Sequence, residues 1–295
     1  MKLISLVGEQ PIPNLLPILY LKPDQNLLVH SAFEGSRRAA KRLKSLAEEF
    51  GIATHFLELK DAYNLIRIRS QLLETLKDQT DLIFNLTGGT KLMVIAAYEA
   101  ARELNASCVY YQTEGPRGRD QRSVLYRYAF DTLGQLEETA KISPLPPLLT
   151  LDSYLKAHLD GYEPNRKSKG KDDVNRERAV NFENAIRQAL SPFVDEYMQN
   201  VVPQGVKDQA EIDALIRCGN HIGVLELKIG GEGSGKHAVD QLTTVAAREY
   251  LGTYVSRFLI TQIAEEDRYK ALATALRVGV IELREYRDGK PLTTN

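Results

Sequence analysis

The sequence predicts an α/β protein of two domains, the first built on a mostly parallel sheet and the second on a mixed sheet. Two observations support this prediction. Short apolar runs alternate with longer amphipathic segments over residues 1–140, and a proline-rich stretch then precedes a second series of strands and helices. The 295 residues, 43% of them hydrophobic, suffice for two hydrophobic cores.

The first half has the order of a βαβ protein. Strands are expected where apolar residues run together, and helices where apolar residues recur at helical spacing. The expected strands are 3–7, 26–30, 54–59, 81–86, 107–111 and, at the edge, 122–130; the expected helices are 34–50, 63–77 and 90–104. Because strands connected through a crossover helix become parallel neighbours, these elements predict a parallel sheet with helices on its faces.

The junction between the domains is expected at residues 142–150, Ile-Ser-Pro-Leu-Pro-Pro-Leu-Leu-Thr, because prolines cannot continue a helix or a central strand. We therefore expect domains over 1–140 and 173–295, joined by a linker over 141–172. The basic stretch 166–171 in this linker is either a solvated connection or a contact to substrate phosphates.

The second half is expected to combine a hairpin with alternating helices and strands. Two apolar strands flank a turn at Gly219-Asn220, and apolar residues recur at helical spacing on either side of this pair. The expected elements are the helices 152–159, 177–190 and 237–250, the strands 211–217, 222–229 and 254–261, and a final helix and strand. The expected fold of this half is α/β with a mixed sheet.

Composition excludes several classes of protein. The formal net charge is −1, so there is no standing basic surface to coat nucleic acid. The two cysteines, Cys108 and Cys218, have no Cys or His residue near them at the spacing of a zinc site, so a structural zinc site or a disulfide framework is not expected. No apolar run is long enough to span a bilayer, and the N-terminus lacks the pattern of a signal peptide, so we expect a cytoplasmic protein without a membrane segment.

Three polar residues of the expected hairpin form a candidate catalytic site. Glu226 and Lys228 share one face, because side chains two residues apart on a strand point the same way. A turn at Gly219-Asn220 would place Asp213 directly opposite Glu226, and opposed like charges destabilise a sheet unless something compensates. Two carboxylates with water supply the ligands that Mg²⁺ or Mn²⁺ prefers, and an ammonium group beside them suits phosphodiester hydrolysis. A solvated surface ion pair is the alternative interpretation.

At these positions the second half resembles the PD-(D/E)xK endonuclease superfamily, with Asp213, Glu226 and Lys228 as its acid, acid and lysine. Glu183, on the preceding helix, matches an additional acid of many members, and Gln241 resembles a glutamine that some members place beside the site. The resemblance implies a restriction-endonuclease-like domain that cleaves RNA or DNA with Mg²⁺ or Mn²⁺. Its implied catalytic residues are Glu183, Asp213, Glu226 and Lys228, with Asp213 and Glu226 as the metal ligands.

In the first half, the expected strand 81–86 runs into Gly88, Gly89, Thr90 and Lys91 and then into a helix. Glycines let the backbone approach a ligand closely, and the N-terminus of a helix offers free N–H groups to a phosphate. Open α/β sheets bind ligands at such carboxyl ends of strands. The pattern therefore favours an anion-binding turn; a capped helix start without a ligand is the alternative.

The segment Thr87-Gly88-Gly89-Thr90-Lys91 resembles the signature of CARF domains, the CRISPR-associated Rossmann-fold sensors of cyclic oligoadenylates. The loop 7–14 and the end of the second strand are similar to further ligand-facing positions, and the likeness spans about residues 1–135. The implied ligand-binding residues are Gln10, Ser31, Thr87, Gly88, Gly89, Thr90 and Lys91.

Taken together, the two halves resemble the CARF-nuclease effectors of type III CRISPR antiviral defence. The resemblance implies a metal-dependent endonuclease that is activated by a cyclic oligoadenylate, with cyclic tetra-adenylate as the expected ring. Because such a ring has rotational symmetry, two identical sensor domains would clasp it across a two-fold axis, which implies a homodimer. Ligand binding would then shift the nuclease domains into a competent arrangement.

Two other functions are compatible with parts of the sequence. Residues 230–237, Gly-Gly-Glu-Gly-Ser-Gly-Lys-His, nearly spell a phosphate-binding P-loop, which would indicate an ATPase. However, His237 stands where the P-loop requires a serine or threonine for Mg²⁺. A non-catalytic nucleotide-sensing regulator is the second alternative, and the presence of Asp213, Glu226 and Lys228 argues against it.

Overall fold

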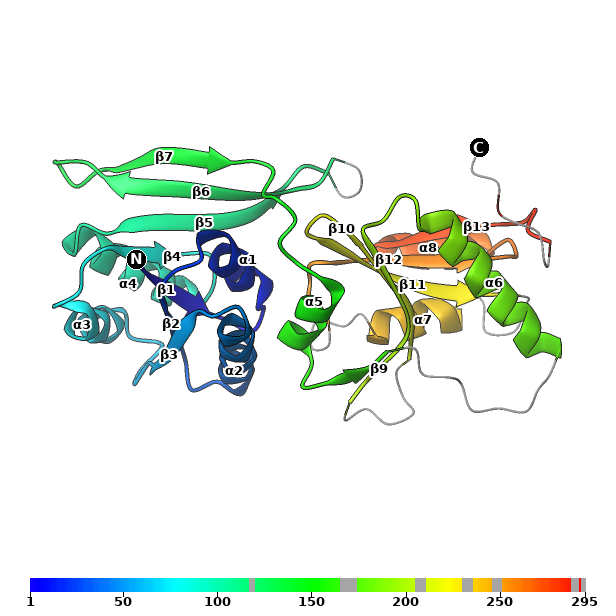
Figure 1. Cartoon of the computed structure of the whole chain (residues 1–295), viewed down its shortest axis with the longest axis horizontal. Helices are drawn as coiled ribbons and strands as arrows, with labels where there is room; N and C mark the ends of the chain where they lie inside the picture. The colour runs from blue at the N-terminus through cyan, green and yellow to red at the C-terminus, as the bar shows by residue number, and fades with distance from the viewer. Residues whose placement is uncertain are drawn as a thin grey trace. The chain divides into compact units, whose positions relative to one another are not determined.

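The structure is a computed structural model of the chain, and it describes residues 1–116, 120–164, 174–204, 211–229, 236–245, 251–287 and 292 (Figure 1). Within these ranges the side chains of 174–176, 241 and 245 are not described. The chain divides into two compact units, which are Met1–Leu149 with Lys156–His158, and Thr150–Leu155 with Leu159–Asn295. The change from unit 1 to unit 2 at residues 149 and 150 lies in the segment where the sequence predicts the linker.

Unit 1 alternates strands and helices and ends in an antiparallel extension. Its strands are β1 (Lys2–Val7), β2 (Gln25–His30), β3 (Ala53–Glu58), β4 (Leu82–Asn85), β5 (Ser107–Glu114), β6 (Arg122–Phe130) and β7 (Leu136–Ile142). Its helices are α1 (Ile12–Leu21), α2 (Glu34–Glu49), α3 (Leu65–Leu76) and α4 (Lys91–Glu103). The predicted strands and helices of this half are confirmed, with ends that differ by at most three residues, whereas β7 was not predicted.

In the described part of unit 1 the sheet has the strand order β3-β2-β1-β4-β5-β6-β7. The first five strands are parallel neighbours, and β6 and β7 continue the sheet in antiparallel pairing. The mostly parallel sheet expected from the βαβ order is therefore confirmed. Helices cover both faces of the sheet, with α1 and α2 on one face and α3 and α4 on the other (Figure 1).

Helix packing in unit 1 follows the hydrophobic pattern of the sequence. Four alanines and one methionine of α4, which are Ala96, Ala97, Ala100, Ala101 and Met93, are buried in a core that also includes the apolar side chains of α3 and of the central strands. Alanine and methionine let α4 lie close to the sheet. On the opposite face, α1 buries almost all of its residues.

Helix α1 was not expected from the sequence, which predicts a loop over 7–14. The reason for the difference is its prolines. Pro13 lies in the first turn, where the missing N–H has no partner to lose, but Pro17 lies inside the helix and removes one backbone hydrogen bond. Tertiary packing of the apolar residues Leu15, Leu16 and Ile18, which are fully buried, stabilises the helix despite this loss.

Unit 2 has a mixed sheet with the strand order β13-β12-β11-β10-β9-β8 in the part that the structure describes. Its strands are β8 (Tyr162–Glu163), β9 (Glu196–Pro203), β10 (Ile212–Cys218), β11 (His221–Lys228), β12 (Val255–Thr261) and β13 (Val278–Glu282). The helices are α5 (Leu151–His158), which the two units share, and α6 (Val174–Leu190), α7 (Lys236–Val245) and α8 (Asp267–Ala275). The strands β11, β12 and β13 are parallel, whereas β8, β9, β10 and β11 pair antiparallel, so the expected mixed sheet is confirmed.

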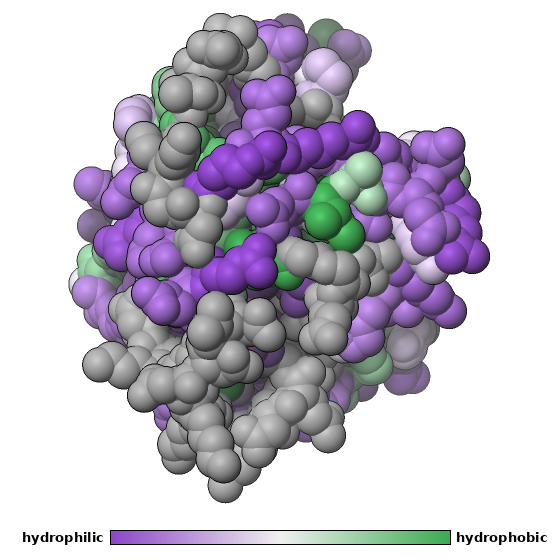
Figure 2. Space-filling view, turned by 90° about the vertical axis from the view of Figure 1, so that its right-hand side faces the viewer, coloured by the Kyte–Doolittle hydropathy of each residue, from purple (hydrophilic) through white to green (hydrophobic). Residues whose placement is uncertain are grey.

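The core of unit 2 forms between α6 and one face of this sheet. Phe182 and Ile186 of α6 are buried together with Ala214, Leu225 and other apolar side chains of the strands. On the face shown in Figure 2, hydrophilic side chains cover most of the described surface and apolar ones form only small areas. None of the helices in the described ranges is long and apolar enough to cross a membrane.

Candidate functional site

The strand order of unit 1 has its switch point between β1 and β4. Chain order reverses at this point, because β2 and β3 follow on one side of β1 while β4 and β5 follow on the other. In open α/β sheets, ligands bind at the carboxyl ends of the strands where the order reverses. Here these ends lead into the loop after Val7 and into the segment Thr87–Thr90, which we call the glycine turn.

The glycine turn lies against the end of β1 so closely that side chains are excluded. A Cβ atom on Gly88 would lie 2.0 Å from the carbonyl oxygen of Leu6, and Gly89 has a φ of +78°, which L-residues rarely adopt. The Cβ position of Gly8 would lie 3.4 Å from the backbone nitrogen of Gly89, so the loop after β1 contacts the turn as well. The two predicted ligand-binding segments are thus neighbours in space.

The two threonines of the glycine turn use their hydroxyl groups inside the fold. The Thr87 hydroxyl donates to Asn85 Oδ1 at 2.7 Å and accepts from the backbone N–H of Tyr111 at 2.7 Å. The Thr90 hydroxyl accepts from the backbone N–H of Met93 at 3.3 Å and caps α4. Thr87, Gly88 and Gly89 are partly exposed, and Thr90 and the adjacent Lys91 are exposed.

The remaining predicted ligand-binding residues lie along the same edge of the sheet. Gln10 is partly exposed in the loop between β1 and α1. Ser31 follows β2 directly, and its hydroxyl accepts from the backbone N–H of Phe33 at 3.3 Å. Nearby, the buried Ser36 donates to the carbonyl oxygen of Val7 at 2.7 Å, which ties the start of α2 to the end of β1. The structure therefore collects all of the predicted positions at the carboxyl ends of β1, β2 and β4.

In unit 2 the hairpin of β10 and β11 has the register that the sequence predicts. Cys218 pairs with His221 around the turn at Gly219 and Asn220, and the pairing continues to Ala214 and Leu225. Continued by one residue, this register places Asp213 opposite Glu226. At that point Asp213 reaches across to β11, where its Oδ2 accepts from the backbone N–H of Leu227 at 2.8 Å.

The acidic cluster, by which we mean Glu183, Asp213, Glu226 and Lys228, forms at this end of the hairpin. Lys228 Nζ lies 2.6 Å from Glu226 Oε1, and the side chains are only 18% and 2% exposed respectively. The same-face placement expected from residues two apart on a strand is therefore found. Lys228 and Glu226 are therefore much less exposed than the two partners of a solvated surface ion pair.

The electrostatics of the acidic cluster are dominated by burial and by an excess of carboxylates. Burial, reinforced by the charges of Asp213 and Glu211, raises the pKa of Glu183 to about 7. Burial also raises the pKa values of Asp213 and Glu226, against the lowering effect of Lys228. For Lys228 burial lowers the pKa, but the neighbouring carboxylates outweigh it, so its pKa lies above the ordinary value and the ammonium group stays charged.

This donor set fits a divalent cation with few protein ligands. Several carboxylates share one lysine, so an additional positive charge would relieve their mutual repulsion. In the ranges that the structure describes, there is no group of three or more His, Cys, Asp or Glu side chains arranged to hold a metal ion. Mg²⁺ is usually bound through one or two carboxylates, water and substrate phosphate oxygens, so Asp213 and Glu226 are a sufficient protein contribution.

Two residues near the acidic cluster were not identified from the sequence. Glu211 precedes β10 and adds to the negative charge felt by Glu183 and Glu226. Tyr197 on β9 is raised in pKa by burial and by the charge of Glu183. Strand β9 itself was not predicted, because its mixture of Tyr, Gln and Asn has no clear alternation, so no signal pointed to Tyr197.

Other residues considered from the sequence lie outside the described part of the chain or at its surface. The side chain of Gln241, the basic stretch 166–171 and the glycine-rich residues 230–235 are not described. Lys236 and His237, the last residues of the P-loop-like segment, are exposed in the first turn of α7.

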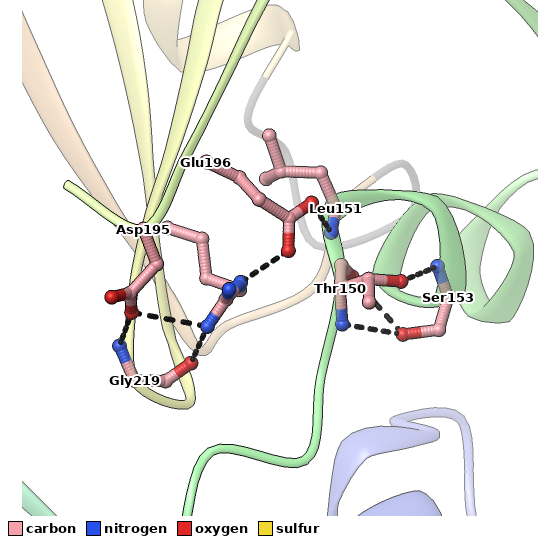
Figure 3. A network of polar contacts seen from close by, with 7 residues as sticks. Thr150, Leu151, Ser153, Asp195, Glu196 and Gly219 are labelled. Carbon is pink, nitrogen blue, oxygen red and sulfur yellow. Dashed lines mark hydrogen bonds and ion pairs between the residues drawn. The ribbon is translucent and has the colours of Figure 1, made fainter. Parts of the chain in front are cut away.

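The far end of the hairpin is fixed by a second polar network (Figure 3). Asp195 Oδ2 accepts from the backbone N–H of Gly219 at 2.7 Å and pairs with Arg217 Nη1 at 3.1 Å. Arg217 Nε in turn donates to Glu196 Oε1 at 2.5 Å, and Glu196 Oε2 accepts from the backbone N–H of Leu151 at 2.9 Å. The hairpin is therefore tied at its turn to the first residue of α5, while its opposite end carries the acidic cluster.

The comparisons with known proteins agree with this two-part architecture. Residues 2–129 match the family model of the Card1 CARF domain, so the CARF domain predicted for the N-terminal half is confirmed. No curated protein sequence matches the chain.

Solved structures extend the likeness to the whole chain. Can2 from Sulfobacillus thermosulfidooxidans, solved in complex with cyclic tetra-adenylate, is similar with a TM-score of 0.71 at 12% identity, covering 96% of both chains. Protein VC1899 from Vibrio cholerae has a TM-score of 0.73 at 15% identity, covering 96% of this chain and 94% of its own. A type III CRISPR defence DNA nuclease activated by cyclic oligoadenylate has a TM-score of 0.60 at 16% identity, and the match covers 89% of this chain but 45% of the nuclease. The predicted fold class, a CARF domain followed by an α/β domain with a mixed sheet, is confirmed.

Proposed function

We propose that this protein is a nuclease effector of type III CRISPR defence. In this proposal a cyclic oligoadenylate activates the protein, and its nuclease activity depends on a divalent metal ion. The observation that carries the proposal is the acidic cluster: two carboxylates and a lysine lie together at the end of one hairpin, with Glu226 buried, Asp213 and Lys228 partly buried, and more negative than positive charge. The similarity in fold to a DNA nuclease of the same defence system, and to Can2 with its bound cyclic tetra-adenylate, supports it.

For the sensor, we propose that unit 1 binds cyclic tetra-adenylate at the carboxyl ends of β1, β2 and β4. The glycine turn offers closely approachable backbone N–H groups at the start of α4, and Lys91 adds a cation. Gln10 and Ser31 lie on the same edge and complete the proposed set. The symmetry of the ring requires the same contacts from a second copy of the chain, so we propose a homodimer.

For the nuclease, we propose that Asp213 and Glu226 hold Mg²⁺ or Mn²⁺. The ion, when bound, would supply Lewis-acid polarisation of the phosphate and lower the pKa of a bound water. Lys228 keeps its positive charge beside this position, where it stabilises the negative charge that develops on the phosphate oxygens during attack. Glu183 contributes a third carboxylate at the border of the cluster. Water replaces the leaving oxygen at phosphorus, so one phosphodiester bond of RNA or DNA is hydrolysed.

A cleavage assay with a matched carboxylate control tests this proposal. Asp213 and Asp195 each accept a backbone N–H of the same hairpin through Oδ2, at 2.8 and 2.7 Å, but at opposite ends. We expect the wild-type protein to cleave labelled RNA or DNA only with Mn²⁺ and cyclic tetra-adenylate, Asp213→Asn to lose this cleavage, and Asp195→Asn to retain it. Equal loss in both variants would point to a structural effect, and full activity of Asp213→Asn would contradict the assigned site.

The proposed dimer has a separate test. Sedimentation equilibrium of the wild-type protein, with and without cyclic tetra-adenylate, should give twice the chain mass, and titration should reach one ring per two chains. A monomer that binds one ring per chain would contradict the two-fold arrangement without affecting the nuclease assignment.

A further inference from the structure

Two buried asparagines lie directly behind the glycine turn. Asn85 is the last residue of β4 and Asn14 lies in the first turn of α1, and neither side chain is exposed at all. Neither residue belongs to the proposed ligand set. Because a buried amide without partners is costly, two such residues in an otherwise apolar layer call for an explanation.

The Asn85 side chain satisfies its full hydrogen-bonding capacity. Its Nδ2 donates to Asn14 Oδ1 at 3.0 Å and to the carbonyl oxygen of Pro13 at 3.1 Å. Its Oδ1 accepts from both the backbone N–H and the hydroxyl of Thr87, at 3.1 and 2.7 Å. The Nδ2 group of Asn85 is therefore hydrogen-bonded to α1, and its Oδ1 atom is hydrogen-bonded to the glycine turn.

The prolines of α1 make the contact to Pro13 available. In a regular helix the carbonyl oxygen of residue 13 would accept from the N–H of residue 17, but Pro17 has no N–H. Asn85 Nδ2 supplies the missing donor. The hydrogen bond that Pro17 cannot donate within α1 is therefore replaced by one from Asn85 of β4. This bond attaches the helix to the strand at the point where the helix lacks a backbone hydrogen bond.

Asn14 extends this arrangement to the end of β1. Its Nδ2 donates to the carbonyl oxygen of Leu6 at 2.9 Å, and the same two atoms face Gly88, where a Cβ would lie 2.8 Å from the Asn14 nitrogen. On the opposite side, Thr87 accepts from the backbone of Tyr111 on β5. The backbone of the glycine turn is thus held against β1, α1 and β5 at once.

We propose that Asn14 and Asn85 are positioning residues of the sensor site, which hold the glycine turn in the conformation that receives an anionic group of the ligand. The inference rests on the proposed function of unit 1. Both side chains are fully buried, so they act through the turn and through Thr87 rather than by touching the ligand. The hydroxyl of Thr87, which the sequence suggests as a ligand contact, belongs to this arrangement.

The test compares Asn85→Leu and Asn14→Leu with a matched buried asparagine. Asn26 lies in the same sheet, is equally buried, and accepts from Ser5 at 2.9 Å without a hydrogen bond to the glycine turn. In titrations of each full-length variant with cyclic tetra-adenylate, we expect Asn85→Leu and Asn14→Leu to bind about tenfold or more weakly than the wild type. Asn26→Leu should lower the melting temperature but bind about as tightly as the wild type.

A second measurement separates positioning from a general loss of stability. Hydrogen exchange of the ligand-free proteins should be faster at the amides of residues 87–90 in Asn85→Leu and Asn14→Leu, with the strands of the sheet unchanged. Wild-type affinity in both variants, or a loss of affinity that follows melting temperature in all three variants, would overturn the inference. Failure of the wild-type protein to bind any cyclic oligoadenylate would instead contradict the proposed function of unit 1.

Discussion

Behind the glycine turn of unit 1 the buried polar side chains are neutral amides, whereas those of the acidic cluster in unit 2 are carboxylates around one lysine. The amides find all of their partners within the chain. The carboxylates outnumber the one lysine, and burial, reinforced by the charges of Asp213 and Glu211, raises the pKa of Glu183 to about 7. The first arrangement makes its hydrogen bonds within the chain, whereas the second has more carboxylates than cations, which is why we proposed a divalent cation there.

The comparison of the two units predicts that the largest loss of activity follows replacement of Lys228, the one positively charged side chain of the acidic cluster. Replacing Lys228 with methionine removes the charge that faces the developing negative charge, so we expect the turnover number for nucleic-acid cleavage to fall about 100- to 1,000-fold. Lys236→Met, at an exposed lysine of α7, is the matched control and should cleave like the wild type. Phosphate release from ATP that disappears in Lys236→Met would favour the P-loop alternative instead.

A steric change in unit 1 should have the next largest effect. A methyl group at residue 88 cannot fit beside the carbonyl oxygen of Leu6, so Gly88→Ala displaces the glycine turn, and we expect about 10- to 100-fold weaker binding of cyclic tetra-adenylate. Gly51→Ala is the control, because Gly51 has a φ of +77° but open space around its Cβ position. It should lower the melting temperature and leave the affinity unchanged. Tight binding by Gly88→Ala would contradict the placement of the ligand at this turn.

Addition of a divalent cation should stabilise unit 2 and leave unit 1 unaffected. At a Mn²⁺ concentration about 100 times its dissociation constant, binding to the folded state adds about 2–3 kcal/mol to the free energy of unfolding. Thermal melts should show this gain in the wild-type protein and not in Glu226→Gln, because one of the two ligands is lost. An equal gain in both proteins would place the ion elsewhere.

The smallest effect concerns pH and Glu183. Because burial raises its folded-state pKa from 4.5 to about 7, the folded protein holds this proton more tightly than the unfolded chain does. The resulting stabilisation is fully present below pH 4.5 and is lost as the pH rises through 7. In EDTA, Glu183→Gln should therefore match the wild type at low pH and exceed it at high pH by about 1–2 kcal/mol, a value reduced for partial solvent exposure. An identical difference at every pH would contradict the shift.

Local patterns were enough to predict the strands β1 to β6 of unit 1, though not β7, and also the hairpin register and the shared face of Glu226 and Lys228. Each of these depends on residues close in sequence, through the two-residue period of a strand or the position of a turn. Helix α1 and strand β9 could not be predicted in this way, because packing against distant segments outweighs the prolines of one and the irregular pattern of the other.

The site residues also fall into those that a local sequence pattern predicts and those that depend on contacts between distant segments. The glycine turn was recognisable from Gly88 and Gly89, since the need for close backbone approach is local. The partnership of Asn14 and Asn85 depends on α1 lying beside the end of β4, 71 residues later in the chain, so no local pattern could indicate it. Similarly, Glu183 reaches the acidic cluster only because α6 packs on the strands of unit 2.

The ties at the turn of the hairpin have a mechanical consequence for unit 2. One carboxylate oxygen of Glu196 accepts from the backbone N–H of Leu151, and the other accepts from the guanidinium group of Arg217 (Figure 3). The start of α5 is therefore hydrogen-bonded to β9, and through Glu196 it is connected to β10. Arg217 and Asp213 both belong to β10, and the carboxylate of Asp213 accepts from the backbone N–H of Leu227 on β11. Strand β10 therefore connects the residues that bind the start of α5 with Asp213, so we expect a displacement of α5 to change the distance between the carboxylates of Asp213 and Glu226.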